Sequence, residues 1–294
     1  MPLRFLHCSD IHLLSLSGVG PHRFLNKRLT GGINLMLSRS RHHDERLFDR
    51  MVEHARTHAV DRVVVTGDLS NLALDEEFEH IAAKLDAIGL PVTVIPGNHD
   101  AYTRGSVRKQ RFERHMLRFM SGERLGGLPS PAAASIDHYP FVQRYDGVAL
   151  IGVSTAHASL PLWAIGTVGP EQLQRLDRML DELGREGLTR IVLIHHPVMP
   201  GVAKARHHLT DLDAFAAVIA RRGAELILHG HEHELIEGTI AGPQRPALVH
   251  GISSGTNVSQ RPERRAAFSV YEASRDGIAR SLHCWDGSDF RREG

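Results

Sequence analysis

Short apolar runs rich in Val, Ile and Leu recur along the chain, separated by polar and turn-forming residues. Runs of this kind, enriched in β-branched residues, are typical of buried strands. We expect strands over residues 3–8, 62–66, 91–95, 148–154, 190–194, 225–229, 247–252 and 267–271.

Between the earlier runs lie segments whose apolar residues recur at helical spacing. We expect helices over residues 44–59, 75–89, 170–184 and 211–223. In the first of these, the residues that fall on one face are Leu47, Met51, Val52 and Ala55. In the third, Pro170 suits the first turn of a helix and Gly184 suits its end.

The order of these elements indicates a fold class. Strands that alternate with helices predict an α/β core with largely parallel strands. From about residue 240 the runs are strands without intervening helices, which predicts a more antiparallel second sheet. Because the sequence shows no repeat and no linker, we interpret residues 1–294 as a single domain.

Composition limits the classes of protein and the cellular locations that fit the chain. Charged residues make up 23% of the chain, and the net charge of +1 argues against a generally polybasic protein that coats nucleic acid. Cys8 and Cys284 lie in apolar runs and are expected to be buried free thiols. No apolar run reaches membrane-spanning length, and the N-terminus enters a strand at once, so we expect no signal peptide and a cytoplasmic protein. The 21 histidines are unusually many.

Carboxylates, an amide and imidazoles follow five of the predicted strands. The segments are Ser9-Asp10-Ile11-His12, Gly67-Asp68, Gly97-Asn98-His99-Asp100, His195-His196-Pro197 and Gly230-His231-Glu232-His233. A single such histidine is more often a core residue than a ligand, but five segments in register are hard to explain in that way. The carboxyl ends of the strands in an α/β sheet line one crevice, and this mixture of donors suits Mn, Fe, Co, Ni or Zn.

The same segments carry a family resemblance. In order they read D-x-H, G-D, G-N-H-[DE], H and G-H-x-H over residues 10–233, which resembles the signature of the calcineurin-like metallophosphoesterase family, in particular its bacterial phosphodiesterase-type members. The resemblance implies an α/β fold in which two β-sheets form a sandwich flanked by helices. It also implies two divalent metal ions, with Mn or Fe expected first and Zn, Co or Ni as alternatives.

The family resemblance assigns roles residue by residue. Asp10, His12 and His233 would hold one metal ion, and Asn98, His195 and His231 would hold the second, with Asp68 bridging the pair. A hydroxide that bridges two such ions would attack the phosphorus of a phosphoester.

The resemblance also implies roles beside the metal ligands. His99 would polarise the phosphoryl oxygen or protonate the leaving group, and Asp100 would orient His99 by accepting its other N–H. His196 would support a ligand or face the substrate. His229 precedes the last motif and is expected to pack in the core or to support a ligand. The remaining histidines, His43 among them, are expected mostly on the solvated surface, although His207 and His208 could border the pocket.

Two basic stretches bear on the substrate. The segment of about residues 13–43 contains Arg23 and Arg28 and no acidic residue before His43, and a second basic run with Arg104 follows the G-N-H-D segment. Both leave from metal motifs, so they could bind extra negative charge on the substrate. For the 13–43 segment the alternative is a basic solvated loop with a few anchoring leucines. Leucines in the 13–43 insert also suggest peripheral contact with a membrane surface.

The resemblance favours hydrolysis of a small anionic phosphodiester, of the cyclic nucleotide or glycerophosphodiester type. The alternatives are a UDP-2,3-diacylglucosamine pyrophosphate hydrolase-like enzyme of the lipid-A pathway and a nuclease. A stable nucleic-acid partner is not expected, because aromatic residues make up only 5% of the chain. A non-catalytic scaffold and a protein phosphatase are weaker alternatives, and the sequence leaves the oligomeric state open.

Overall fold

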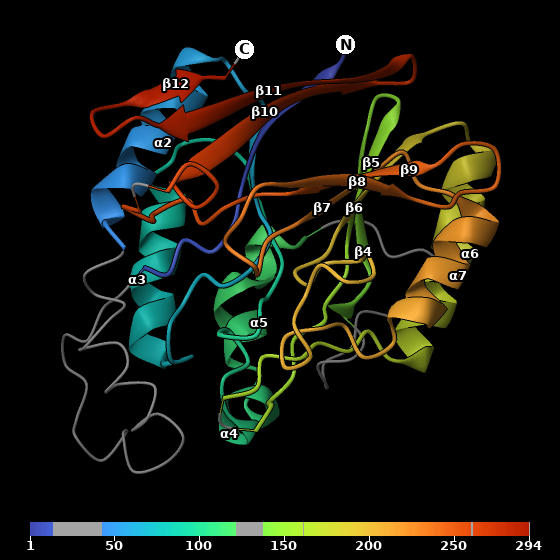
Figure 1. Ribbon diagram of the computed structural model, residues 1–294, viewed down its shortest axis with the longest axis horizontal. Coiled ribbons are helices and arrows are strands. Elements are labelled where there is room, and N and C mark those ends of the chain that lie inside the picture. Colours follow the sequence, from blue (N-terminus) through green and yellow to red (C-terminus); the bar gives the residue numbers. More distant parts are fainter. Residues whose placement is uncertain (14–42, 122–137, 161, 260, 294) are drawn as a thin grey trace.

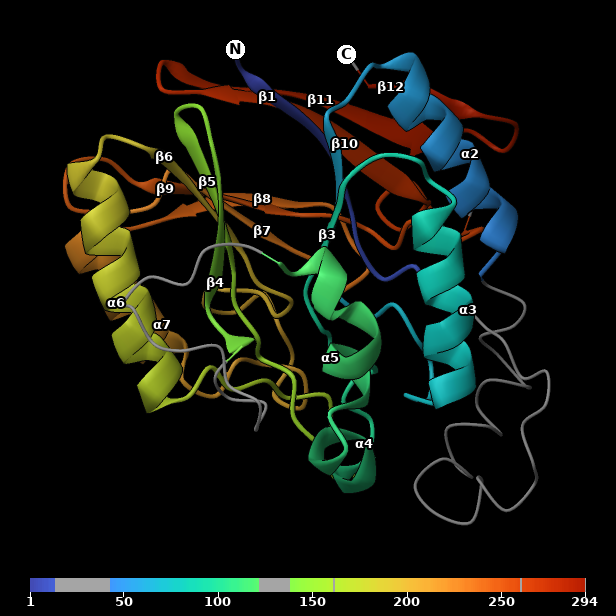
Figure 2. The same ribbon diagram turned by 180° about the vertical axis from the view of Figure 1, so that it is seen from behind.

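Two six-stranded sheets lie face to face, and helices cover their outer sides. The computed structural model describes residues 1–13, 43–121, 138–160, 162–259 and 261–293. Figures 1 and 2 show the pair α2 and α3 on one side of the molecule and the pair α6 and α7 on the other. This is the predicted α/β sandwich of two sheets. Most of the predicted basic insert, residues 14–42 with Arg23 and Arg28, lies outside the described residues.

The first sheet has the strand order β12-β11-β10-β1-β2-β3. The strands are β1 (Leu3–Cys8), β2 (Arg62–Val65), β3 (Val92–Val94), β10 (Ala267–Ser274), β11 (Gly277–Trp285) and β12 (Phe290–Arg292). β1 lies parallel to β2, with Phe5 opposite Arg62, and antiparallel to β10, with Leu6 opposite Val270. Sequence therefore predicts the parallel half of this sheet, and the antiparallel half comes from the far end of the chain.

The second sheet has the strand order β4-β5-β6-β7-β9-β8. The strands are β4 (Phe141–Tyr145), β5 (Val148–Gly152), β6 (Thr189–Leu193), β7 (Leu226–His229), β8 (Ile236–Ile240) and β9 (Ala247–Gly251). β5, β6, β7 and β9 run parallel to one another, and the edge strands β4 and β8 are antiparallel to β5 and β9.

The expectation that the strands after residue 240 form a second sheet is wrong. β10, β11 and β12 are antiparallel as predicted, but they extend the first sheet because β10 pairs with β1. β9 joins β7 in parallel. A pairing between residues 3 and 273 is set by tertiary packing, and the local sequence pattern carries no information about it.

The four predicted helices are present with closely similar bounds. They are α2 (Glu45–Thr57), α3 (Asp75–Asp86), α6 (Pro170–Arg185) and α7 (Leu212–Arg222). The side chain of Asp44 caps α2 by accepting the N–H of Arg46 at 2.9 Å, and Pro170 occupies the first turn of α6. The short helices α4 (Arg104–Arg108) and α5 (Arg111–Met116) and the 3₁₀ turn η3 (Leu117–Phe119) were not predicted, nor were β4, β8, β11 and β12.

Both faces of the central strands are buried, which explains their continuous apolar runs. On β6, Ile191 and Leu193 pack toward the first sheet, whereas Val192 belongs to the cluster that α6 and α7 cover. This packing holds the carboxyl ends of the strands of both sheets at fixed positions. Cys8 and Cys284 are buried free thiols, as predicted.

Candidate metal centre

The polar segments that follow the strands adopt an uncommon backbone conformation. Five of their non-glycine residues have positive φ, namely Asp10 (52°), His12 (43°), Asp68 (51°), His231 (76°) and His233 (53°). Left-handed backbone costs free energy for residues other than glycine, and such strain concentrates at functional sites. These five are among the nine described non-glycine residues with positive φ, and each of the five is a predicted metal ligand.

Glycines next to these residues allow the segments to approach one another. A Cβ atom at Gly97 would overlap the carboxylate and backbone nitrogen of Asp68, and a Cβ atom at Gly230 would overlap Asp10 and the hydroxyl of Ser9. The glycine in each motif is therefore required by close packing against a neighbouring polar residue.

Asp10, His12 and His233 form the first half of the cluster. Nε2 of His233 lies 3.2 Å from Oδ1 of Asp10 and 3.4 Å from Nε2 of His12. Asp10 is completely buried, and its Oδ2 accepts the backbone N–H of His231 at 3.0 Å. Oxygen and nitrogen donors that converge at these separations can share one cation.

Asn98, His195 and His231 form the second half. Nε2 of His195 lies 3.2 Å from Oδ1 of Asn98 and 3.3 Å from Nδ1 of His231. Asp68 lies between the two halves, because its Oδ2 is 3.5 Å from Nε2 of His195 and 3.9 Å from Nε2 of His12. The structure thus brings together all seven residues for which the sequence predicts metal ligation.

Backbone carbonyls fix the ring tautomers of three of the histidines. The acceptors are the carbonyl of Ser70 for Nδ1 of His12 (3.3 Å), that of Thr66 for Nδ1 of His195 (2.8 Å) and that of His207 for Nε2 of His231 (3.0 Å). Because a carbonyl can only accept, each of these nitrogens carries the proton, and the lone pair of a neutral ring sits on the nitrogen that faces the cluster. This orientation is typical of histidines that bind metals.

The charges within the cluster also suit a cation. Burial alone would raise the pKa of Asp68, but His195 and the neighbouring imidazoles hold it well below its ordinary value. Burial alone would lower the pKa of His195, but the carboxylates of Asp68 and Asp10 raise it to about 9. The cluster therefore favours a bound positive charge, and its oxygen and nitrogen donors fit divalent transition metals.

His99 lies beside the cluster in a different arrangement from the predicted one. Its Nδ1 donates to the carbonyl of Asn71 at 2.9 Å, and its backbone N–H donates to Oδ1 of Asp68 at 2.7 Å. Its ring is half-buried, 5.1 Å from the ring of His12 and stacked on Tyr102. His99 is therefore close enough to act on a group bound at the cluster.

The predicted contact between Asp100 and the ring of His99 is wrong. The carboxylate of Asp100 is buried and accepts the N–H groups of Leu69, Ser70 and Gly97 and the hydroxyl of Ser70. It joins the segment that carries Asp68 to the segment that carries Asn98. Asp100 thus positions two of the predicted ligands, Asp68 and Asn98, whereas the carbonyl of Asn71 orients His99.

The predicted substrate contacts are only partly supported. His196 is completely buried, with Nδ1 bonded to the hydroxyl of Thr155 at 2.7 Å and Nε2 to the carbonyl of Ala164 at 3.0 Å, so it does not face a substrate. Its ring centre lies 4.2 Å from that of His231, so it packs against this predicted ligand. Arg104 is exposed at the start of α4.

Two other arginines of the same basic run are engaged in ion pairs. Arg111 is buried and pairs with Asp75, and Arg118 pairs with Asp86 at 2.6 Å. These two charges therefore tie α5 and η3 to α3 and are not directed at a substrate.

His43 is the site residue that the sequence interpretation missed. It was expected on the solvated surface, but its ring centre lies 4.9 Å from that of His12 and 5.9 Å from that of His233. Each of these three histidines offers one ring nitrogen, and the three nitrogens all lie within 4.8 Å of one another. No local motif marks His43, because its position depends on contacts with a distant loop.

His207 borders the cluster, because its carbonyl binds His231 and its ring centre lies 5.6 Å from that of His231. His208 is bonded to the carbonyl of Ala205 instead. His229 is buried, and its Nδ1 donates to the carbonyl of Gly230, in agreement with its predicted packing role.

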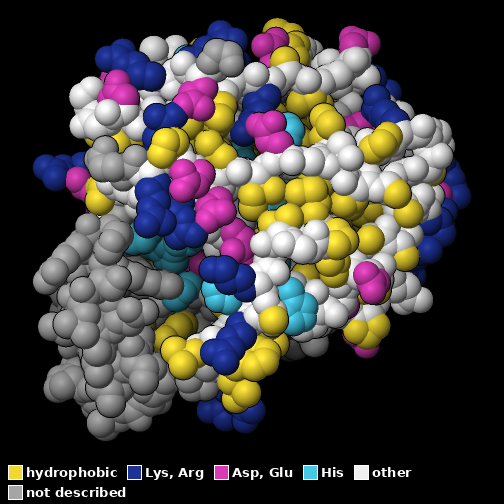
Figure 3. Space-filling view, viewed as in Figure 1, with side chains coloured by type: hydrophobic (Ala, Val, Ile, Leu, Met, Phe, Trp, Pro, Cys, Tyr) yellow, Lys and Arg dark blue, Asp and Glu magenta, His cyan; other side chains and the backbone are white. Residues whose placement is uncertain are grey.

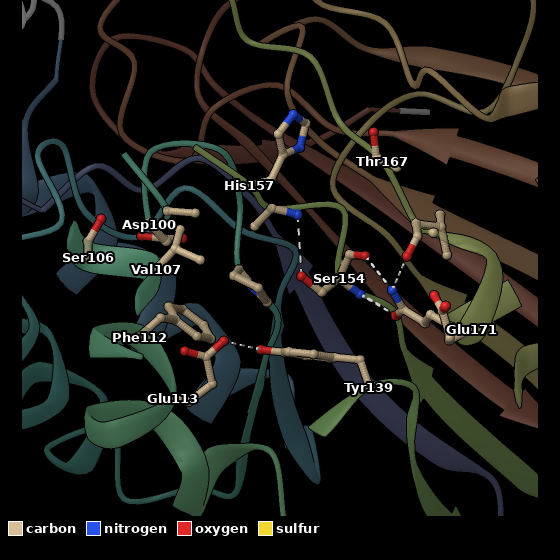
Figure 4. Close-up of a pocket in the computed structure, with 16 residues that line it drawn as sticks. Asp100, Ser106, Val107, Phe112, Glu113, Tyr139, Ser154, His157, Thr167 and Glu171 are labelled. Atoms are coloured by element: carbon tan, nitrogen blue, oxygen red, sulfur yellow. Dashed lines mark hydrogen bonds between the residues drawn. The ribbon is translucent and has the colours of Figure 1, made fainter. Parts of the chain in front are cut away.

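A separate pocket of about 330 Å³ lies beside the cluster (Figure 4). Asp100, Glu113, Tyr139, His157 and Glu171 are among its lining residues, and the hydroxyl of Tyr139 donates to Glu113 at 3.5 Å. None of the seven predicted ligands is among the described residues that line it. The cluster of predicted ligands therefore lies outside this pocket.

The surface is consistent with access to a histidine-rich site. Figure 3 shows histidine side chains exposed together on one face, next to Lys and Arg side chains. Every helix in the described part of the chain falls short of what a membrane span requires in length and apolar character.

Comparison with known proteins agrees with the fold and the motifs. The family model described as calcineurin-like phosphoesterase matches residues 3–235. The chain belongs to this family. It is also similar to a probable cyclic nucleotide phosphodiesterase of Synechococcus sp., with 25% identity over 234 residues that make up 78% of each chain.

Solved structures share the fold at lower sequence identity. A dimetal phosphatase from Danio rerio superposes with a TM-score of 0.65 at 16% identity, covering 99% of this chain and 98% of the other. A purple acid phosphatase from yellow lupin (Lupinus luteus) seeds superposes with a TM-score of 0.62 at 12% identity, covering all of this chain and 53% of the other.

Proposed function

We propose that the chain hydrolyses phosphoesters with two divalent metal ions held by Asp10, His12, Asp68, Asn98, His195, His231 and His233. One observation carries this proposal: seven side chains from five segments converge, with the lone pairs of three tautomer-fixed imidazoles directed into the cluster. Oxygen and imidazole donors suit Mn or Fe first, with Zn, Co or Ni as alternatives.

The proposed chemistry divides between the metal ions and the protein. Two bound ions would lower the pKa of a water molecule and neutralise the charge of a phosphoryl group. The protein supplies the fixed ligands and a buried setting that strengthens electrostatic interactions. Nδ1 of His99 is held by the carbonyl of Asn71, and in this proposal Nε2 donates a proton to the leaving oxygen or polarises the phosphoryl group.

A small phosphodiester of the cyclic nucleotide or glycerophosphodiester type is the proposed substrate. The family supports a phosphoester substrate, and the name of the Synechococcus relative supports the choice of a cyclic nucleotide. A cytoplasmic location and a single-domain organisation remain predictions from the sequence, as does the absence of a stable nucleic-acid partner.

One observation favours a second candidate, an amphiphilic phosphoester such as UDP-2,3-diacylglucosamine. The loop between β5 and α6 exposes Leu160, Leu162 and Trp163, which are 66%, 82% and 40% exposed. The guanidinium of Arg206 lies 6.0 Å from the Trp163 ring centre. The same loop supplies the carbonyl of Ala164 that binds His196. Apolar side chains close to the cluster could contact acyl chains.

Replacing Asn98 with Ala tests the proposed function directly. The variant loses one oxygen donor from the second half of the cluster, so we expect turnover of bis-p-nitrophenyl phosphate with added Mn²⁺ to fall at least ~10²-fold. Gln174→Ala, an exposed residue of α6, is the control. Unchanged turnover in the Asn98 variant would refute the assignment. The same assay with cAMP, glycerophosphodiesters, UDP-2,3-diacylglucosamine, phosphomonoesters and DNA then separates the substrate classes.

Replacing His99 with Ala tests its proposed catalytic role. Because its side chain is not one of the seven proposed ligands, we expect the metal content to stay at the wild-type value while kcat falls by ~10²–10⁴-fold. Metal content is measured by elemental analysis after dialysis, and kcat with bis-p-nitrophenyl phosphate. Loss of both ions in this variant would contradict the role that we give to His99.

A further inference from the structure

We propose that His43 is an additional ligand of the metal ion held by Asp10, His12 and His233. This inference rests on the proposed dinuclear function. His43 lies just before Asp44, the N-cap residue of α2, and between His12 and Asp68 in the chain. Three features of its surroundings carry the assignment.

The backbone at His43 is anchored to the loop that follows β9. His43 forms an isolated antiparallel β-bridge with Asn257, and the N–H of Asp44 donates to the carbonyl of Thr256 at 2.8 Å. The same loop is held against the first metal motif, because the N–H of Gly255 donates to the carbonyl of Ser9 at 2.9 Å. These contacts fix His43 relative to Asp10 and His12.

Two hydroxyl groups determine the tautomer of His43. Nδ1 lies 2.8 Å from the hydroxyl of Thr256 and 3.4 Å from that of Ser254. Each hydroxyl has one proton, and both protons are already donated, from Thr256 to the carbonyl of Ile11 and from Ser254 to the carbonyl of Asp10. Both oxygens must therefore accept, so Nδ1 carries the proton and the lone pair of neutral His43 is on Nε2.

The ring geometry matches that of the other ligands. Imidazole nitrogens lie about 2.0–2.1 Å from a zinc-like ion, which puts the centres of neighbouring rings that share one ion about 5 Å apart. The proposed ligand pairs agree, at 5.3 Å for His12 and His233 and 5.1 Å for His195 and His231. The ring centre of His43 lies 4.9 Å from that of His12 and 5.9 Å from that of His233, which is close to these separations.

This ligand would make the two metal ions unequal. The first ion would have Asp10, His12, Asp68, His233 and His43, whereas the second would have Asp68, Asn98, His195 and His231. An additional neutral imidazole raises affinity without changing the net charge, and it takes a coordination position that water or substrate would otherwise occupy. The second ion is then the more weakly held and the more open to the substrate.

Metal titration of the apoprotein tests the assignment without using activity. We expect calorimetry with MnCl₂ to detect two sites in the wild type, and His43→Ala to weaken one of them by about 10–100-fold while leaving the other unchanged. Thr256→Val, which removes the orienting hydroxyl from a buried side chain of similar shape, should weaken the same site by a smaller factor. His80→Ala, whose ring is bonded to Glu45, is the control and should bind like the wild type.

The outcomes separate the two proposals. A wild-type protein that binds no Mn²⁺ would overturn the proposed function. Two unchanged affinities in both His43→Ala and Thr256→Val would overturn the role of His43 alone, and so would a raised KM with unchanged affinities, which would make His43 a substrate contact only. Circular dichroism of each apoprotein checks the fold, and Thr256→Val decides the question if His43→Ala does not fold.

Discussion

An Asp68→Asn variant should lose most of its bound metal and nearly all of its activity. Oδ2 of Asp68 lies between the two halves of the cluster, 3.5 Å from His195 and 3.9 Å from His12, so one substitution affects both proposed ions. The amide removes a negative charge from a site that is 2% exposed. We expect fewer than one ion per chain after dialysis and a fall in kcat/KM of roughly 10³-fold or more.

Asp49→Asn is the matched control for this experiment. Asp49 pairs with Lys84 at 3.0 Å on the surface of α2, where the same chemical change should have little effect. Elemental analysis and kcat/KM for bis-p-nitrophenyl phosphate are measured on both variants. Two ions per chain together with unchanged kcat/KM in Asp68→Asn would exclude a shared ligand.

The convergence of the ligands was predictable from sequence because it depends on strand ends. Asp10, Asp68 and Asn98 follow β1, β2 and β3, which are adjacent in the first sheet, and His195 and His231 follow β6 and β7, which are adjacent in the second. Parallel strands bring such residues to one edge, so position along the chain is enough to group them within each sheet. The residue pattern does not predict that the edges of the two sheets meet. That expectation rests on the family resemblance.

Other features depend on contacts that no local pattern encodes. His43 reaches the cluster through hydroxyls of the loop after β9, and β10 pairs with a strand more than 260 residues earlier, with Leu3 opposite Ala273. The orientation of His99 by a backbone carbonyl is likewise not visible in sequence, because every residue has a carbonyl. The sequence instead draws attention to the neighbouring carboxylate of Asp100, which does not contact the His99 ring.

Replacing Asp100 with Ala distinguishes the observed role from the predicted one. The substitution leaves four buried donors without their acceptor: the N–H groups of Leu69, Ser70 and Gly97 and the hydroxyl of Ser70. Buried donors that lose their partners cost about 1–3 kcal/mol each, and relaxation and water recover part of this, so we expect the free energy of unfolding to fall by roughly 3–5 kcal/mol.

Metal binding should weaken together with stability in this variant, because Asp100 joins the segments that carry Asp68 and Asn98. Urea unfolding of the apoprotein measures the stability, and Mn²⁺ titration measures the metal affinity. Asp100→Asn keeps one acceptor oxygen and should lose less of both. If Asp100 instead acted by orienting His99, its loss would lower kcat while stability and metal affinity stayed at the wild-type values. That combination would contradict the structure, because the carboxylate would then contribute nothing to holding the two segments together.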